Sequence, residues 1–242
     1  MISISNLSAG YSRHAPVLSG VDAVLPSGAL IAMVGCNGSG KSTLLRTIAG
    51  LLHPLSGSVS YDGKQVGTAS PAELARMRAF VGTQKIRVPG LTCPNLVAMG
   101  RAPYTGWAGS LSDDDEKAVG LALEATGMEK FRDRDMDSIS DGECQMIAIA
   151  RAIAQDTPVI LLDEPTAFLD FPNRRRTAAL LKSLTCDNGR TVIYSTHDIE
   201  LAAEYSDLLL LVRRNGIFVS APSSAEMKAE ISAAFFNTGH SR

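Results

Sequence analysis

The sequence lacks several features, and each absence narrows what the protein can be. Its four cysteines are scattered, at positions 36, 93, 144 and 186, and no pair has the spacing of a zinc site or a redox motif. We therefore expect free thiols. The first residues lack a basic region followed by an apolar core, so we expect no signal peptide.

The chain also lacks long apolar runs and an excess of one charge. No apolar run approaches the roughly 18 residues that a membrane-spanning helix needs, so any work at a membrane must go through a partner. The 23 basic and 25 acidic residues give a net charge of −2. We therefore expect no nucleic-acid partner held by bulk charge, although a local basic patch is not excluded. With 242 residues and 45% hydrophobic composition, the chain can bury one large core.

A glycine-rich stretch gives the strongest signal in the sequence. It follows an apolar run at 29–34 that predicts a buried strand, and it opens a helical pattern at 43–52. Its glycines would let successive N–H groups point at a β-phosphate, with Lys41 reaching the β/γ-phosphates and the Ser42 hydroxyl placed for Mg²⁺. The alternative is a chance glycine-rich turn. The predicted ATP-binding residues here are Gly35, Cys36, Asn37, Gly38, Ser39, Gly40, Lys41, Ser42 and Thr43.

A second apolar run, 159–162, ends in the acidic pair Asp163 and Glu164. It predicts a central parallel strand. Because parallel strands present functional groups at their carboxyl ends, this pair is expected beside the phosphate loop. Asp163 would hold Mg²⁺, and Glu164 would take a proton from an attacking water or orient that water. The alternative is an ordinary turn or helix cap.

Two further polar residues follow predicted strands. Gln84 comes after a short strand at 80–83, and His197 comes after a buried strand at 191–195. His197 could bind the γ-phosphate, and Gln84 could reach Mg²⁺ or the attacking water. A structural histidine and a surface glutamine are the alternatives.

The segment 139–145 precedes a helical pattern at 146–154. Ser140 is predicted to be an N-cap, and Glu143 has the spacing of a capping-box partner. Ser140 and Gly142 would also suit an anion at a helix N-terminus. The two interpretations are compatible.

The remaining pattern predicts an α/β core with an insertion. Residues 2–8 alternate like a half-buried edge strand, and residues 17–25 and 57–63 add strands of an N-terminal antiparallel β region. Residues 88–138 are predicted to form a helical subdomain, with 1–87 and 139–242 as the core. The acidic run at 113–116 is read as a capped helix start after Ser112 rather than a metal site.

Taken together, these motifs resemble those of the nucleotide-binding subunit of ATP-binding cassette (ABC) transporters. The resemblance covers essentially the whole chain. It implies a P-loop NTPase fold, an α/β class with a mixed sheet. The matching segments, each in this sequence's numbering, are Walker A (35–43), the Q-loop glutamine (Gln84), a variant signature (139–143), Walker B (159–164), the D-loop (168–170), the switch histidine (His197) and an adenine-stacking aromatic (Tyr11).

The family resemblance implies a mechanism and partners. Two subunits would sandwich two ATP molecules head to tail, so that Ser140, Gly142 and Glu143 face the nucleotide held by the other chain. Glu164 would act as general base, and Mg²⁺ would accompany ATP. A membrane permease would bind the helical subdomain at the cytoplasmic face of the inner membrane. An extracytoplasmic binding protein would recognise the cargo.

The segment 97–104 and the Ser-Asp-Gly-Glu signature resemble, more narrowly, importers of iron–siderophore complexes, haem and vitamin B12. The alternatives are an ABC ATPase without a permease, such as an iron–sulfur assembly component, and a non-catalytic switch, against which Glu164 argues. The usual signature is Leu-Ser-Gly-Gly-Gln. The charges of Asp141 and Glu143 could therefore weaken closure on a phosphate unless each is turned away or paired. Cys36 stands where proline or alanine is usual.

Overall fold

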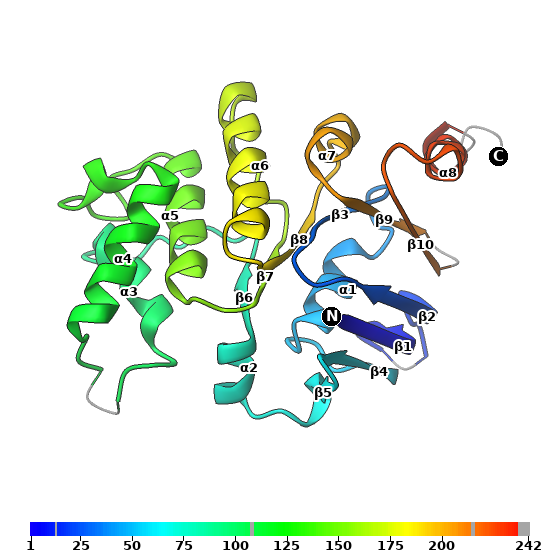
Figure 1. Ribbon diagram of the computed structural model, residues 1–242, viewed down its shortest axis with the longest axis horizontal. Coiled ribbons are helices and arrows are strands. Elements are labelled where there is room, and N and C mark those ends of the chain that lie inside the picture. Colours follow the sequence, from blue (N-terminus) through cyan, green and yellow to red (C-terminus); the bar gives the residue numbers. More distant parts are fainter. Residues whose placement is uncertain (13, 107–108, 214–215, 237–242) are drawn as a thin grey trace.

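The computed structural model describes residues 1–12, 14–106, 109–213 and 216–236. Within them, two sheets pack beside a lobe of helices (Figure 1). The larger sheet has the order β10-β9-β3-β8-β7-β6. Its strands are β3 (Leu30–Val34), β6 (Arg78–Val81), β7 (Val159–Leu162), β8 (Thr191–Ser195), β9 (Leu208–Arg213) and β10 (Gly216–Ser220).

The larger sheet is mixed, as predicted. The strands β9, β3, β8, β7 and β6 run parallel, and β10 pairs antiparallel with β9. Every residue of β3, β7 and β8 is buried, which explains why β3 and β7 appear in the sequence as unbroken apolar runs. The prediction of a central parallel strand at 159–162 is confirmed. The strand predicted at 80–83 begins two residues earlier, at Arg78.

The smaller sheet is antiparallel and has the order β2-β1-β4-β5. The prediction that residues 2–8 form an edge strand is wrong, because β1 pairs with β2 on one side and with β4 on the other. Its alternation reflects burial of one face only. The strands are β1 (Ile2–Ala9), β2 (Leu18–Leu25), β4 (Ser56–Tyr61) and β5 (Lys64–Gln65).

Helices fill the space on both faces of the larger sheet. The core between the two sheets contains α1, whose Leu44, Leu45 and Ile48 are fully buried. A second core on the opposite face joins the larger sheet to α5, α6, α7 and α8. The helices are α1 (Lys41–Ile48), α2 (Pro71–Met77), α3 (Cys93–Ala98), α4 (Asp113–Thr126), α5 (Asp141–Ala154), α6 (Phe171–Cys186), α7 (Ile199–Tyr205) and α8 (Ala225–Phe236).

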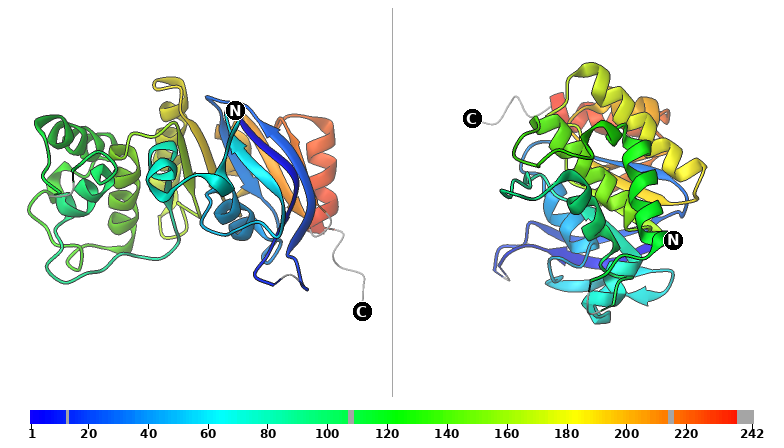
Figure 2. Two further views of the ribbon diagram at one scale, coloured as in Figure 1. Left: turned by 90° about the horizontal axis from the view of Figure 1, so that it is seen from below. Right: turned by 90° about the vertical axis from the view of Figure 1, so that its left-hand side faces the viewer.

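A third core holds α3 and α4 against one side of α5. Figure 2 shows this helical lobe at the end of the molecule away from the smaller sheet. The α4 helix begins with a capping box between Ser112 and Asp115, so the acidic run at 113–116 is a helix start, as predicted. Asp115 also pairs with Arg101 at 2.7 Å. The hydrogen bonds from Ser112, together with that from Arg101, lower the pKa of Asp115 to about 2.

The boundaries predicted at 88 and 138 stay a prediction, because α5 packs against both the lobe and the larger sheet. Its first helical residue is Asp141, five residues before the predicted start. The sequence also predicts a loop at 101–107 and a turn at Asn215 and Gly216, and of these Trp107 and Asn215 lie outside the described residues. Across the described ranges, no helix has the length and apolar character to cross a membrane.

Candidate nucleotide site

The glycine-rich loop joins β3 to α1 in a conformation that its glycines permit. Gly38 and Gly40 have φ values of 76° and 101°, which disfavour any residue with a side chain. A Cβ on Gly35 would lie 2.5 Å from the Val212 carbonyl oxygen of β9. These constraints explain the glycine spacing. The loop leads directly into α1, whose first N–H groups are suited to bind an anion.

Lys41 begins α1 and folds back over the loop. Its Nζ donates hydrogen bonds to the carbonyl oxygens of Gly35 at 2.8 Å and Cys36 at 3.2 Å. Only 6% of the residue is exposed. Burial lowers the pKa of Lys41, and the nearby Glu164 carboxylate partly offsets this shift. A phosphate entering the loop would offer this ammonium a stronger, charged acceptor than the two carbonyls.

Asp163 lies directly beside the loop, at the carboxyl end of β7. Its Oδ1 accepts hydrogen bonds from the hydroxyls of Ser42 at 2.9 Å and Ser195 at 2.7 Å. Its Oδ2 is buried and has no hydrogen-bond partner among the described residues. An orphaned carboxylate oxygen next to a serine hydroxyl fits Mg²⁺, which prefers oxygen ligands. Ser42 and Asp163 are therefore the residues that would hold the ion.

Glu164 follows in an uncommon backbone conformation, with a φ of 51°. Its N–H donates to Ser195 Oγ at 2.8 Å, which fixes the turn. Its Oε2 lies 4.0 Å from His197 Nδ1, and the His197 side chain is 57% exposed. The structure thus brings together the acidic pair, the phosphate loop and His197, as the sequence predicted.

Two residues at this site were missed by the sequence analysis. Ser195, fully buried, binds Asp163 through its hydroxyl hydrogen and the Glu164 N–H through its oxygen. Arg46 lies 3.8 Å from Asp163 Oδ2 and donates to the hydroxyl of Tyr11 at 3.4 Å. The position of Ser195 at the end of a buried strand was a usable signal. Arg46 looked like an ordinary polar residue within a helix.

The remaining predicted residues are less closely connected to the acidic pair. Tyr11 is 67% exposed, and Asn37 lies exposed at the tip of the loop. Gln84 lies three residues beyond β6, and within the described chain it makes no hydrogen bond to Asp163 or Glu164. Cys36 is half-buried, and its Sγ donates to the Ala234 carbonyl of α8. Ser39 and Thr43 are both buried.

The 139–143 segment forms a separate site at the start of α5. Ser140 is the N-cap, and its N–H and Oγ both donate to Glu143 Oε2 at 2.8 Å. These bonds lower the pKa of Glu143. A cavity of about 800 Å³ opens here, with Ser140, Gly142 and Leu169 in its wall. No phosphate-loop residue lines this cavity, so the described chain keeps the two sites apart.

The chain is similar to a known protein family and to individual members of it. Residues 18–167 match the family model described as "ABC transporter". The achromobactin transport ATP-binding protein CbrD of Dickeya dadantii (strain 3937) is 37% identical over 235 residues, covering 97% of this chain and 87% of that protein. The petrobactin import ATP-binding protein FpuC of Bacillus anthracis is 38% identical over 214 residues, covering 88% of this chain and 78% of that one.

Among solved structures, the dimeric post-hydrolysis state of the ATP-binding cassette MJ0796, bound to ADP and Pi, is similar in fold. It superposes with a TM-score of 0.81 at 27% identity and covers 93% of this chain and 100% of that one.

Proposed function

Because this chain belongs to the ABC transporter family, and so binds and hydrolyses ATP for transport, we propose that it is the ATPase subunit of an importer for iron chelates. Haem and cobalamin are the other cargoes that the sequence resemblance suggested. The names of the two relatives, one an achromobactin transporter and one a petrobactin importer, support the iron-chelate class. The observation that carries the ATPase assignment is the bonded set of Ser42, Asp163 and Ser195 beside the phosphate loop.

The phosphate groups of ATP would enter the loop between its N–H groups and Lys41. Lys41 would then exchange its bonds to Gly35 and Cys36 for the phosphate oxygens. Mg²⁺, held by Ser42 and Asp163 with Gln84 as a further candidate ligand, would supply positive charge against the developing charge on the phosphates. The exposed ring of Tyr11 is free to stack on adenine.

Hydrolysis needs a base positioned at the attacking water. Glu164 is held by the Ser195 bond to its N–H, and its carboxylate is only partly exposed. It would accept the water proton at a carboxylate oxygen. His197, next to Glu164 and open to solvent, would donate a hydrogen bond to the γ-phosphate. Ser195 acts on both acidic residues and is a positioning residue.

The separation of the two sites supports a head-to-tail dimer. The phosphate loop offers half of a γ-phosphate site, and the Ser140 turn offers an anion-accepting helix N-terminus elsewhere on the surface. A second copy could supply the missing half to each nucleotide, including Ser140, Gly142 and Glu143. The dimeric, ADP-bound cassette with the same fold is consistent with this arrangement.

The helical lobe is the proposed permease-binding surface. It exposes large apolar side chains, with Val88 at 48%, Met99 at 56% and Tyr104 at 39%. Large exposed apolar side chains are candidates for the contact residues of such an interface. Through this contact the subunit would work at the cytoplasmic face of the membrane, and a separate extracytoplasmic protein would recognise the cargo.

The test is to co-express the chain with a candidate permease and binding protein and to measure ATP-driven uptake of a radiolabelled ferric siderophore into vesicles. We expect uptake, and we expect the change of Val88 and Met99 to serine to abolish permease copurification while ATPase activity persists. Val24→Ser, at a 64% exposed position on β2, is the matched control. ATPase activity without permease binding or uptake would instead indicate an ABC ATPase that serves no permease.

A further inference from the structure

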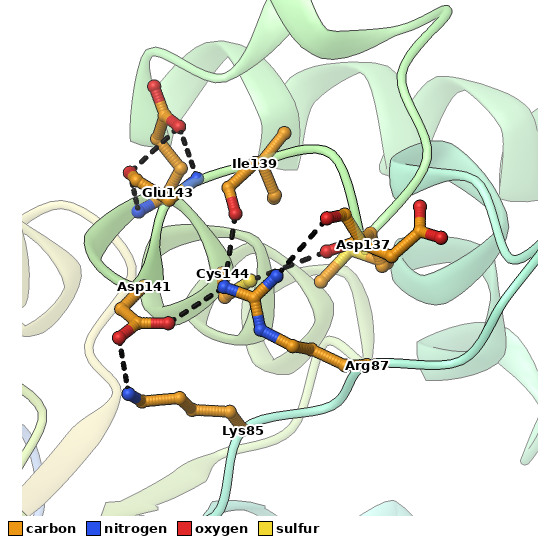
Figure 3. Close-up of polar contacts among 9 residues, drawn as sticks. Lys85, Arg87, Asp137, Ile139, Asp141, Glu143 and Cys144 are labelled. Atoms are coloured by element: carbon orange, nitrogen blue, oxygen red, sulfur yellow. Dashed lines mark hydrogen bonds and ion pairs between the residues drawn. The ribbon is translucent and has the colours of Figure 1, made fainter.

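Two cations bind the carboxylate of Asp141, the first residue of α5. Lys85 Nζ donates to Asp141 Oδ2 at 2.5 Å, and Arg87 Nη2 donates to Oδ1 at 2.7 Å. Both come from the loop after β6, which also contains Gln84. Figure 3 shows the Asp141 carboxylate turned toward Lys85 and Arg87, while the Glu143 carboxylate lies on the other side of the turn. Each carboxylate oxygen of Asp141 therefore has its own cation.

Arg87 also binds the backbone that leads into Ser140. Its guanidinium donates to the carbonyl oxygens of Asp137 at 3.3 Å and Ile139 at 3.1 Å (Figure 3). The planar guanidinium thus connects the approach to the helix with the first helical side chain. This geometry fixes the direction in which the Ser140 turn faces.

Lys85 extends the same cluster to the segment after β7. Its Nζ lies 4.0 Å from the ring centroid of Phe168, a cation–π contact. That segment also lies close to the α5 turn, because a Cβ on Gly142 would be 3.1 Å from Leu169 Cδ2. The loop after β6, the start of α5 and the segment at 168–169 therefore meet around Lys85.

Folding stability does not explain this cluster well. The side chains of Lys85, Arg87 and Asp141 are 30%, 38% and 45% exposed, and ion pairs at such exposure contribute little to stability. The ion pairs have a more direct effect on the net charge at the start of α5. Asp141 and Glu143 place two carboxylates where an external phosphate would bind, and Lys85 and Arg87 add two positive charges. The hydrogen bonds from Lys85 and Arg87 also keep the pKa of Asp141 below its usual range.

We propose that Lys85 and Arg87 are positioning residues that hold Asp141 away from the nucleotide of the partner subunit and cancel its charge. The Ser140 turn then remains able to accept a γ-phosphate although its first turn is acidic. This inference rests on the proposed head-to-tail dimer. It gives the loop after Gln84 a specific role, because a shift of that loop would release Asp141 and set a like charge against the phosphate.

The test measures ATP-driven dimerisation by sedimentation, with Glu164→Gln in every chain so that bound ATP persists. Replacing both Lys85 and Arg87 with glutamine should weaken dimerisation roughly tenfold, because the Asp141 carboxylate then has no paired cation and repels each phosphate. Adding Asp141→Asn should restore most of it. Raising the salt concentration should shrink the defect by screening. A purely structural role predicts neither the rescue nor the salt effect.

Lys85→Gln alone keeps the backbone bonds of Arg87, so it should fold normally and give a smaller defect that Asp141→Asn also rescues. The matched control removes two exposed charges elsewhere, Lys64 and Lys117, and should leave dimerisation unchanged. Undiminished dimerisation in the Lys85/Arg87 variant, or a defect that Asp141→Asn does not relieve, would overturn the proposal. Failure of the Glu164→Gln parent to dimerise with ATP would overturn the head-to-tail dimer itself.

Discussion

The phosphate-loop site and the α5 site differ in how completely the chain organises them. Around the loop, Lys41, Asp163 and Ser195 are at most 6% exposed. Lys41 donates to the loop after β3, and Asp163, after β7, accepts from Ser42 of α1 and Ser195 of β8. At the start of α5, the Ser140 turn lies beside an open cavity, and partly exposed ion pairs neutralise the charge of Asp141.

This difference indicates separate roles for the two halves of the nucleotide site. The buried half is prepared for the triphosphate and the ion, since groups that are already held in place by hydrogen bonds need little reorganisation when the substrate arrives. The open half is a helix N-terminus at the surface, with the carboxylates of Asp141 and Glu143 in its first turn. We therefore expect changes in the buried half to alter nucleotide binding and hydrolysis in each chain. Changes in the open half should alter association.

The largest effect is expected for Glu164→Gln. Loss of the general base should reduce steady-state phosphate release by about a thousandfold, while ATP-dependent dimerisation persists because the contacts to the phosphates remain. Phosphate release measured with a coupled assay checks the first part, and sedimentation checks the second. Glu116→Gln, on the exposed surface of α4, is the control. Undiminished release from the Glu164 variant would remove this residue from the chemistry.

Lys41→Ala should weaken ATP binding roughly tenfold to hundredfold, because a charged hydrogen bond to phosphate is lost from a buried position. Titration with a fluorescent ATP analogue on the monomer gives the dissociation constant. Lys117→Ala removes an exposed ammonium and should have no effect. Normal affinity in the Lys41 variant would contradict the phosphate-loop assignment.

Ser140→Arg tests the open half. The monomer should bind ATP with normal affinity, since Ser140 and the phosphate loop lie apart in the chain. Dimerisation should fall by more than about tenfold, because the bulky side chain displaces the cap that a partner's phosphate would meet. Parallel nucleotide titration and sedimentation separate the two effects. A drop in monomer affinity instead would mean that both halves act on one nucleotide within one chain.

The smallest effect is expected for Ser195→Ala. Losing its two bonds should leave the Asp163 and Glu164 carboxylates less well placed and lower kcat by roughly tenfold, with a smaller change in ATP affinity. Ser206→Ala, which loses a buried bond to the Tyr194 hydroxyl away from the acidic pair, controls for stability. Equal kcat in the two variants would show that Ser195 has no positioning role.

The site could be predicted from the sequence where its residues belong to a local pattern along the chain. Residues 35–43 and the acidic pair after 159–162 could be found because a loop between a strand and a helix, and a carboxylate at a strand end, are local patterns. The edge-strand prediction for β1 was wrong because pairing with β4 depends on residues 48 to 59 positions away.

The ion-pair cluster could not be predicted for the same reason. Lys85 and Asp141 are 56 residues apart, and no local pattern joins them. The sequence did indicate that acidic residues at 141 and 143 would lie near a phosphate and would need to be paired or turned away. In the structure, two cations bind Asp141, and the capping bonds from Ser140 hold Glu143.

The central claim is that each nucleotide is completed by two copies of the chain, and a crystal structure of the Glu164→Gln variant with ATP and Mg²⁺ tests it most directly. We expect each γ-phosphate to lie within hydrogen-bond distance of Lys41 from one copy and of Ser140 of the partner subunit. A triphosphate that is remote from Lys41 and Asp163, or that contacts a single copy only, would contradict the account.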